Sequence, residues 1–525
     1  MNRMDRMEQT TEEFRQDLAG FREMTDKFYA KEISVKEYKG YSGGFGSYAQ
    51  RGGKASMLRL RLPGGRLTKE KLRFIADTVA EYGIRKVHFT TCQTVQLHDL
   101  DAKSVCEVME KALDAGIVTR GGGGDFPRNV MVSPLSGVEK GEYFDVMPCA
   151  EAVSDYLLGM VRTVKMPRKL KVGFSNSPAN ETHATFRDLG FAARQDGTFD
   201  VYSAGGLGNN PRTGVKVAEH VLPSEVLYYV KAMVDTFVEY GNYENRAKAR
   251  TRYMQETLGA DGYKKAYLEK LEAVKASEEL TLDIAGLSEA YSAAGEDKAH
   301  EAVGVTGKRV IPQKQEGLYA VAYHPIGGVP KPSKFEEIYE VIKDMDKTEL
   351  RIAPDETVYI INLNGEEAEK VLAATADGAD NLFETSVACI GAAVCQIGLR
   401  DSQGALADIV KEVKKYDFAD GVLPRIHISG CVSSCGTHQI GMLGFHGGVK
   451  RVDDAAKPAF TMHVNGSCLE GEERFGEQWG MMLQEDLPAF FAELGQAVQA
   501  EGTDFQTWYR KDPERFRKLA DKYLY

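Results

Sequence analysis

LPRIHISGCVSSC, residues 423–435, matches an earlier segment of the same chain, MPRKLKVGFSNSP, residues 166–178. The Pro-Arg pair, the alternation of residue types and one glycine fall in register. Two further pairs match in the same order: TTCQTVQLHDL (90–100) with APDETVYIINL (353–363), and LPGG (62–65) with PIGG (325–328). Three matches in one order predict that the fold is an internal duplication.

Each copy has the pattern of a small α+β layer. Apolar residues recur at helical spacing in both copies, at Leu72, Ile75, Ala76 and Val79 and at Phe335, Ile338, Val341 and Ile342. Ser333 and Glu336 form a capping-box pattern before the second helix. Alternation at Val87, Phe89, Val95 and Leu97 predicts half-buried strands. We therefore expect sheets with helices on one face.

The two copies differ in chemistry. The alignment places three cations of the first copy against apolar residues of the second: Arg59, Lys169 and Lys171 against Ala322, Ile426 and Ile428. Conversely, Cys431 and Cys435 of the second copy stand against Phe174 and Pro178. If the halves pack around a pseudo-two-fold axis, the cations and the thiols can face one site.

Composition sets the outer limits. The chain has 525 residues, which suggests two to four domains, and 43% of them are hydrophobic. The formal charge of −11 argues against a general nucleic-acid binder. No run of eighteen apolar residues predicts a membrane span, and the charged start MNRMDRMEQTTEEF argues against secretion. We expect a cytoplasmic protein.

Eight cysteines in such a chain do not form a disulfide scaffold. Four are scattered and are expected to be buried thiols: Cys92, Cys106, Cys149 and Cys468. The other four form two close pairs, Cys389/Cys395 and Cys431/Cys435. Such a quartet can hold an iron–sulfur cluster or a structural zinc ion. The wide first gap and the small neighbouring residues favour a cluster, with zinc and no metal as alternatives.

Cys-x5-Cys followed by Cys-x3-Cys resembles the siroheme and [4Fe-4S] sulfite/nitrite reductase family. Further segments look like other signatures of that family, in its order: MLRLRLPGG (57–65), TTCQTVQLH (90–98), PRNV (127–130), PRKLK (167–171) and GGLG (205–208). The resemblance runs from about residue 40 to the C-terminus. It implies an α+β fold, internally duplicated, with ferredoxin-like half-domains and two larger α/β cofactor domains.

The resemblance also implies roles. The ligands of the [4Fe-4S] cluster would be Cys389, Cys395, Cys431 and Cys435, with Cys435 also bridging to siroheme iron. The cations around the bound anion would be Arg59, Arg128, Lys169 and Lys171. Siroheme would be held by Arg61, Thr90, Thr91, Gln93, Thr94, Gln96, His98, Asn129, Gly205 and Gly206.

The implied domains are a helical extension over 1–50 and a first ferredoxin-like half-repeat over 51–118. A siroheme and substrate domain with a helical connector follows over 119–310. A second half-repeat covers 311–376, and a cluster and siroheme domain covers 377–525.

The implied reaction is the six-electron reduction of sulfite to sulfide, because related nitrite reductases tend to carry Asn where this chain has Lys171. Nitrite reduction to ammonia, a corrin-pathway oxygenase on the same scaffold, a non-catalytic iron–sulfur carrier or sensor, and a zinc-stapled binding module are the alternatives. No nicotinamide or flavin motif and no second cluster motif occurs, so ferredoxin or a flavoprotein reductase would supply electrons.

Two positions depart from the family pattern. The resembling enzymes place arginines, which bind siroheme carboxylates, where this chain has His88 and Cys92. Substitutes for these cations would be Arg61, Arg120 or Arg212.

Overall fold

The computed structural model describes residues 3–289 and 304–525. The helical extension expected for residues 1–50 is present as α1 (Arg3–Tyr29) and α2 (Val35–Ser42), and Ser34 and Glu37 form a capping box at the start of α2. Every helix in the described residues is too short or too polar to cross a bilayer.

The first ferredoxin-like unit is a four-stranded sheet with the order β1-β2-β5-β4. Two helices pack on it through one shared core. Its elements are β1 (Ser47–Ala49), β2 (Ser56–Leu60), β3 (Arg66–Leu67), α3 (Lys69–Glu81), β4 (Val87–Phe89), β5 (Val95–Leu100) and α4 (Ala102–Asp114).

The second unit repeats this order, with sheet order β11-β12-β14-β13-β3. Its elements are β11 (Val310–Pro312), β12 (Tyr319–Tyr323), α9 (Lys334–Ile342), β13 (Glu349–Ile352), β14 (Val358–Leu363) and α10 (Gly365–Ala374). Strand β3 comes from the first unit and pairs with β13. One hydrophobic core, which includes Leu72 and Ile338, spans both units, so they fold as one body.

Two larger domains have the same strand pattern, in which three parallel strands are followed by two antiparallel ones. The first contains β6 (Met131–Val132), α5 (Met147–Gly159), β7 (Val172–Ser175), β8 (Leu189–Ala193), β9 (Phe199–Ser203), β10 (Val215–Val221), α6 (Val226–Tyr240), α7 (Met254–Ser277) and α8 (Ile284–Glu289). The second contains β15 (Val387–Ala388), α11 (Ser402–Val413), β16 (Ile426–Ser429), β17 (Leu443–Val452), β18 (Ala455–Val464), β19 (Glu477–Leu483), α12 (Leu487–Gln499), α13 (Phe505–Lys511) and α14 (Pro513–Ala520).

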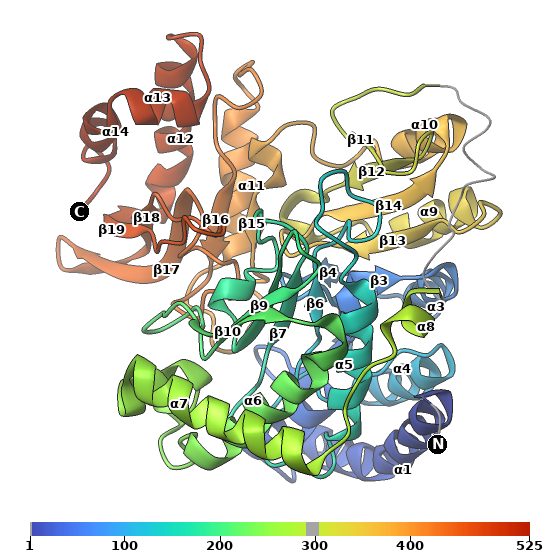
Figure 1. Ribbon diagram of the computed structural model, residues 1–525. Coiled ribbons are helices and arrows are strands. Elements are labelled where there is room, and N and C mark those ends of the chain that lie inside the picture. The colour runs from blue at the N-terminus through green and yellow to red at the C-terminus, as the bar shows by residue number, and fades with distance from the viewer. Residues whose placement is uncertain (1–2, 290–303) are drawn as a thin grey trace.

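Each large domain has its own core, and the duplicated architecture is therefore confirmed. In Figure 1 the second ferredoxin-like unit and the red C-terminal domain occupy the top, while α5, α6 and α7 lie below the β6–β10 sheet. The connector expected up to residue 310 contains α7 and α8, and its part at 290–303 lies outside the described residues.

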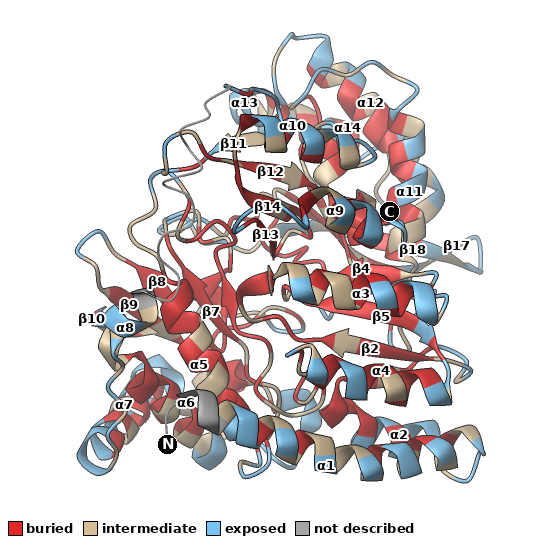
Figure 2. Cartoon of the chain, turned by 90° about the vertical axis from the view of Figure 1, so that its right-hand side faces the viewer, coloured by how far each residue is buried: buried red, intermediate tan, exposed pale blue. Residues whose placement is uncertain are grey.

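The strands of the first unit are more buried than their alternation predicts. The apolar side chains of β4 and β5 face α3 and α4, but the polar His88, Gln96 and His98 are buried as well. The other half of the molecule covers His88, whose Nε2 lies 3.4 Å from Glu356 Oε1, whereas Gln50, just after β1, covers His98. Figure 2 shows these central strands in red, between helices whose outer faces are exposed.

The capping box expected at Ser333 is wrong. The backbone of Ser333 is already helical, its side chain makes no cap, and its Oγ donates to Glu337 Oε1 at 2.7 Å.

One segment of the sequence alignment is also wrong, by three residues. The alignment set His427 against Leu170, but in the sheets Gly173 pairs with Gly190 as His427 pairs with Gly444. The two partner glycines are equivalent, since a Cβ at Gly190 or Gly444 would lie 1.9 or 1.8 Å from a carbonyl oxygen of the preceding loop. The Pro-Arg match lies in the lead-in loops, and hydrogen-bonded ladders, not loops, set the strand register. Lys171 is therefore equivalent to Arg425.

Candidate active site

The four paired cysteines lie in two loops at one edge of the C-terminal sheet. Cys389 follows β15 and Cys431 follows β16, and these strands are parallel neighbours, so their carboxyl ends meet. Glycine is required where the loops touch, because a Cβ at Gly391 would lie 2.6 Å from Ser402 N and one at Gly430 2.6 Å from Arg400 O. The parallel pairing of β15 and β16 thus places both thiol pairs at the same edge.

The thiols are close enough to influence one another. Burial, followed by the charge of Cys435, raises the pKa of Cys389 to about 12. The pKa of Cys435 is also raised, by desolvation from the surrounding protein and by Cys431 and Cys395, although this residue is exposed at the surface. Gly430 N donates to Cys389 Sγ at 3.1 Å. An iron–sulfur cluster site needs thiols that give up their protons when metal binds, with backbone N–H donors beside them. The cysteine quartet therefore fits a cluster.

The cations of the first half meet the thiols of the second. Lys169 and Lys171 both act on the pKa of Cys435 and lower it against the effect of burial. Thr91 Oγ1 donates to the carbonyl of Cys435 at 2.7 Å, which ties the first-half motif to the cluster loop. Sequence positions more than 250 residues apart are thus brought together across the halves.

The two arginines meet at the glycine-rich loop. Arg59 Nη1 and Arg128 Nη1 donate to the carbonyl of Gly122 at 2.6 and 3.0 Å. Arg128 Nη2 also donates to Gly124 O at 3.0 Å, and Arg128 Nε is buried without a partner. Both side chains keep some exposure, so donors remain for an anion.

Both lysines have a pKa lowered by their surroundings. Burial is the largest cause for Lys169, followed by the charges of Arg250, Lys171 and Arg128. For Lys171, the thiolate of Cys92 raises the pKa, but burial, Arg187 and Arg250 outweigh it. An ammonium group with a lowered pKa gives up its proton more readily.

Cys92 is part of the site and is not the inert buried thiol expected. Its Sγ lies 3.2 Å from Lys171 Nζ. Burial alone would raise the pKa of Cys92, but Lys171, Arg187 and Arg59 lower it to about 6. The lowered pKa favours the thiolate form of Cys92 at neutral pH.

The residues assigned to siroheme divide into two groups. The side chains of Arg61, Gln93 and Asn129 donate to backbone carbonyls, at distances of 2.7–3.4 Å, and so shape the loops around the site. In Arg61 these bonds use both Nη atoms, and Nε is buried without a hydrogen-bond partner among the described residues. Arg120 likewise donates hydrogen bonds to the Asp17 carboxylate and to Gly44 O. Of the three substitute cations, Arg61 and Arg212 each have their Nε buried without a hydrogen-bond partner among the described residues.

The remaining assigned residues line the motif strand and the glycine turn. Thr90 and Thr94 share a hydroxyl hydrogen bond of 2.7 Å, Gln96 Oε1 lies 3.4 Å from His88 Nδ1, and His98 Nδ1 lies 3.3 Å from Gln50 Oε1. A Cβ at Gly205 would lie 2.8 Å from Arg187 O, and one at Gly206 would lie 3.2 Å from Arg252 Nη1. Glycine is therefore required at position 205, where the neighbour is backbone, whereas at position 206 the neighbour is the end of a flexible side chain.

Three arginines near the site escaped the sequence analysis: Arg187, Arg250 and Arg252. Arg187 and Arg250 act on the pKa of Lys171, and Arg250 donates to both carboxylate oxygens of Asp188 at 3.0 Å. Arg250 Nε and Arg252 Nη1 are buried without partners. In the sequence, only the Arg-Thr-Arg run at 250–252 could have pointed to a cationic group here. Buried guanidinium donors without partners suit a polycarboxylate cofactor such as siroheme, so the donor set fits that cofactor.

Comparison with protein families agrees with this geometry. Residues 123–275 match the nitrite and sulphite reductase 4Fe-4S domain, and residues 48–115 and 311–377 match the nitrite/sulfite reductase ferredoxin-like half domain. Together these matches cover more than half of the chain.

Similar proteins carry both substrate names. The chain is 27% identical to a ferredoxin–nitrite reductase of Synechococcus elongatus, over 83% of this chain and 85% of the relative. It is 23% identical to a sulfite reductase [ferredoxin] 1 of Mycolicibacterium paratuberculosis, over 88% and 83%. The solved structure of the Mycobacterium tuberculosis NirA protein has a TM-score of 0.74, with 22% identity and 93% of both chains covered, which shows the shared fold.

Family, fold and donor set agree, and the zinc-stapled module is excluded. The chain is an oxidoreductase of the nitrite and sulfite reductase family, whose members work with siroheme and a [4Fe-4S] cluster.

Proposed function

We propose that this protein reduces sulfite to sulfide with six electrons from an external donor. The observation that carries the proposal is that the charges of Lys169 and Lys171 both act on the Cys435 thiol and lower its pKa. Sulfite carries two negative charges, and two lysines offer two positive charges. An anion with a single negative charge would need only one of them.

The cofactors would be held by residues from both halves. Cys389, Cys395, Cys431 and Cys435 would ligate the cluster, and Cys435 would be the ligand shared with siroheme iron. Thr91 would orient the Cys435 carbonyl, and Arg187, Arg250 and Arg252 would face siroheme carboxylates. When bound, siroheme supplies an iron for the substrate, and the cluster supplies electrons to it.

The four cations would bind and protonate the anion. Arg59 and Arg128 keep fixed, permanently charged N–H groups, which suit oxyanion oxygens. Lys169 and Lys171, whose pKa values are lowered, would deliver protons as each oxygen leaves as water. The arginines would thus hold the anion and the lysines would supply protons, which suits a reaction that consumes protons at every step.

Nitrite is the second candidate substrate, and a specific observation favours it. The thiolate of Cys92 balances the charge of Lys171 at 3.2 Å, so the extra positive charge is partly cancelled. Nitrite, with one negative charge, needs less compensation. Several of the relatives are named as nitrite reductases.

An acidic donor of the ferredoxin type would dock beside the cluster loops. Ile397, Leu399 and Val432 are 57%, 54% and 47% exposed in or next to these loops. Arg51 reaches them and donates to Cys395 O at 3.1 Å and to Gly398 O at 2.6 Å. A positive residue among exposed apolar side chains suits an acidic partner, which must come close to the cluster.

The first experiment is anaerobic purification from cells that make siroheme, followed by absorption spectra and counts of iron and acid-labile sulfide. A haem-type Soret band with about five irons per chain supports the cofactor set. The kcat/KM values for sulfite and nitrite, measured with one reduced donor, then decide the substrate. A higher value for nitrite would replace the proposal with the second candidate.

A further inference from the structure

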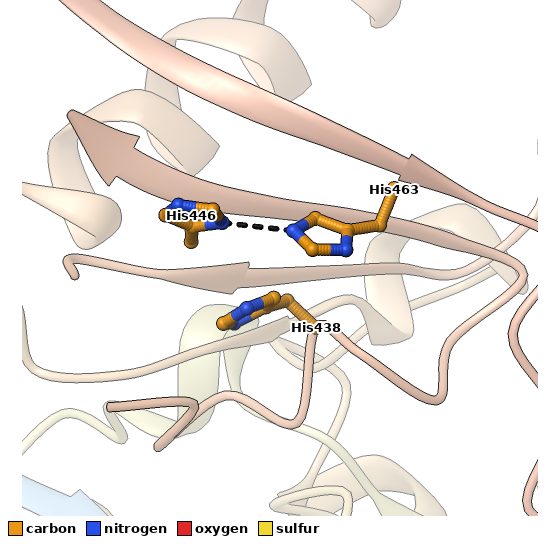
Figure 3. A group of neighbouring side chains, drawn as sticks. All are labelled: His438, His446 and His463. Atoms are coloured by element: carbon orange, nitrogen blue, oxygen red, sulfur yellow. Dashed lines mark hydrogen bonds between the residues drawn. The ribbon is translucent and has the colours of Figure 1, made fainter. Parts of the chain in front are cut away.

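Three histidines converge in the C-terminal domain, apart from the cysteine quartet (Figure 3). His438 precedes β17, His446 lies in β17 and His463 lies in β18. One ring nitrogen of each lies within 4.8 Å of the others. His438 and His463 are buried, and His446 is half-buried. Imidazole nitrogens in such a group are a ligand set for divalent transition metals.

The sheet places two of these rings side by side. β17 and β18 are antiparallel, and His446 pairs with Thr461, two residues from His463. Both side chains therefore stand on the same face of the sheet. The His438 ring packs against them, with centroids 4.9 Å from His446 and 4.8 Å from His463.

Two of the rings make further hydrogen bonds to groups outside the trio. His438 Nδ1 lies 2.9 Å from Ser429 Oγ, which accepts Gly436 N–H at 3.0 Å. The backbone of Gly476 forms a hydrogen bond with His463 that raises its pKa. Because His463 Nε2 faces His446 Nδ1 at 2.8 Å, the Gly476 contact falls to Nδ1. Metal-binding histidines usually have their second nitrogen held in this way.

Burial also favours the neutral form of the rings, which is the form that binds a metal ion. Burial lowers the pKa of all three, that of His463 to about 4. Neutral imidazoles offer lone pairs, whereas protonated rings would repel a cation.

Metal binding requires only a small change. Nitrogen ligands of a tetrahedral zinc ion lie about 3.3 Å apart when the Zn–N distance is about 2.0–2.1 Å. His446 Nδ1 and His463 Nε2, now 2.8 Å apart, would separate slightly. The shared proton would move to the other nitrogen of His446, whose side chain is half-buried and can reach water.

We propose that His438, His446 and His463 bind one divalent transition-metal ion of the zinc class, distinct from the iron of the cluster. His438 follows Cys435 by three residues on one loop. The ion would tie this loop to β17 and β18 and so hold Cys431 and Cys435 in place. Water would take the fourth position, beside His446.

The test is zinc binding by the cofactor-loaded protein. Wild-type protein is dialysed against zinc sulfate, freed of loose metal on a chelating resin, and analysed for zinc and iron by mass spectrometry. We expect about one zinc per chain, with three nitrogen ligands at about 2.0–2.1 Å by X-ray absorption. In His446→Gln, which keeps a polar side chain of similar size, zinc should fall at least tenfold while iron is unchanged.

His220→Ala is the matched control, because His220 is an exposed histidine that contacts only Asp196 among the described partners. It should retain zinc. The proposal is overturned if wild-type protein holds no zinc, or if His446→Gln holds as much as wild type. If iron also falls in His446→Gln, His463→Gln replaces it and is judged by the same zinc-to-iron ratio.

Discussion

Cys92 Sγ lies 3.2 Å from Lys171 Nζ, and the equivalent positions of the second copy, Asp355 and Arg425, hold a carboxylate–guanidinium pair at 2.6 Å. The same two positions thus carry an anion and a cation in each copy. Arg425 lowers the pKa of Asp355 against the effect of burial, as Lys171 does for Cys92. The duplication kept the ion pair and changed its chemical type.

Removing the Cys92 thiolate should shift the substrate preference toward sulfite. In Cys92→Ser the charge of Lys171 is no longer balanced, so a dianion gains more than a monoanion. We expect the ratio of kcat/KM for sulfite to that for nitrite to rise roughly three- to tenfold, equivalent to about 1 kcal/mol. Steady-state kinetics with both substrates measures it. Cys106→Ser, at a buried thiol remote from the cations, is the control, and an unchanged ratio in Cys92→Ser would show that the thiolate does not tune the site.

The effect of Cys92 should depend on pH. The pKa of Cys92 is lowered to about 6, so the thiolate is present above that pH and is lost as pH falls through it. Wild type and Cys92→Ser should therefore differ in sulfite kcat/KM at pH 7–8 and converge below about pH 6. Taking the ratio of the two proteins at each pH cancels the titration of sulfite itself. A ratio that stays constant from pH 5 to 8 would contradict a thiolate in the active site.

Lys171→Asn should favour nitrite. The variant removes a positive charge that acts on Cys435. The remaining positive charge balances nitrite, with one negative charge, better than it balances sulfite, with two. We expect kcat/KM for sulfite to fall at least tenfold more than that for nitrite. Lys265→Asn, on the exposed face of α7, is the control for loss of a lysine. Equal losses for both substrates would remove the charge argument for sulfite.

Cys435→Ser should abolish the cluster. Serine is a poor ligand for iron at this position, and Cys435 is the thiol influenced by both the cations and the other cysteines. We expect the loss of about four irons and their sulfide per chain, with no sulfite reduction. Cys149→Ser, at a buried thiol in another core, should keep the iron. Full turnover in Cys435→Ser would disprove its assignment as a ligand.

Reversal of charge at Arg51 should weaken donor docking. Arg51→Glu places a negative group beside Ile397 and Leu399, where an acidic ferredoxin would approach. The KM for ferredoxin should rise about tenfold, while turnover with a small dye reductant stays the same. Wild-type turnover with ferredoxin should also fall as salt rises. Lys265→Glu is the matched control, and equal KM values for the two variants would place the docking surface elsewhere.

Much of this protein could be predicted from local sequence. The cysteine spacing, the repeated Pro-Gly-Gly turns and the helical periodicity describe short stretches, and short stretches carry their own conformational preferences. The equivalence of Arg59 with Ala322 is confirmed, since Arg59 pairs with Gln96 in β2–β5 as Ala322 pairs with Tyr359 in β12–β14. The alignment that used the Pro-Arg loops failed because the length of a loop can change at little cost in free energy. A shift of strand register, by contrast, is costly, so the register is the feature that both copies keep.

What the sequence by itself determined is the duplication and the two close pairs of cysteines, because each is written in residue types at short, fixed spacing. Only the tertiary structure decided that Cys92 meets Lys171, that Glu356 covers His88, and that three histidines converge beside the cluster loop. These contacts join residues from separate strands, loops and halves. Their charges and pKa values depend on burial and on neighbours that chain order does not reveal.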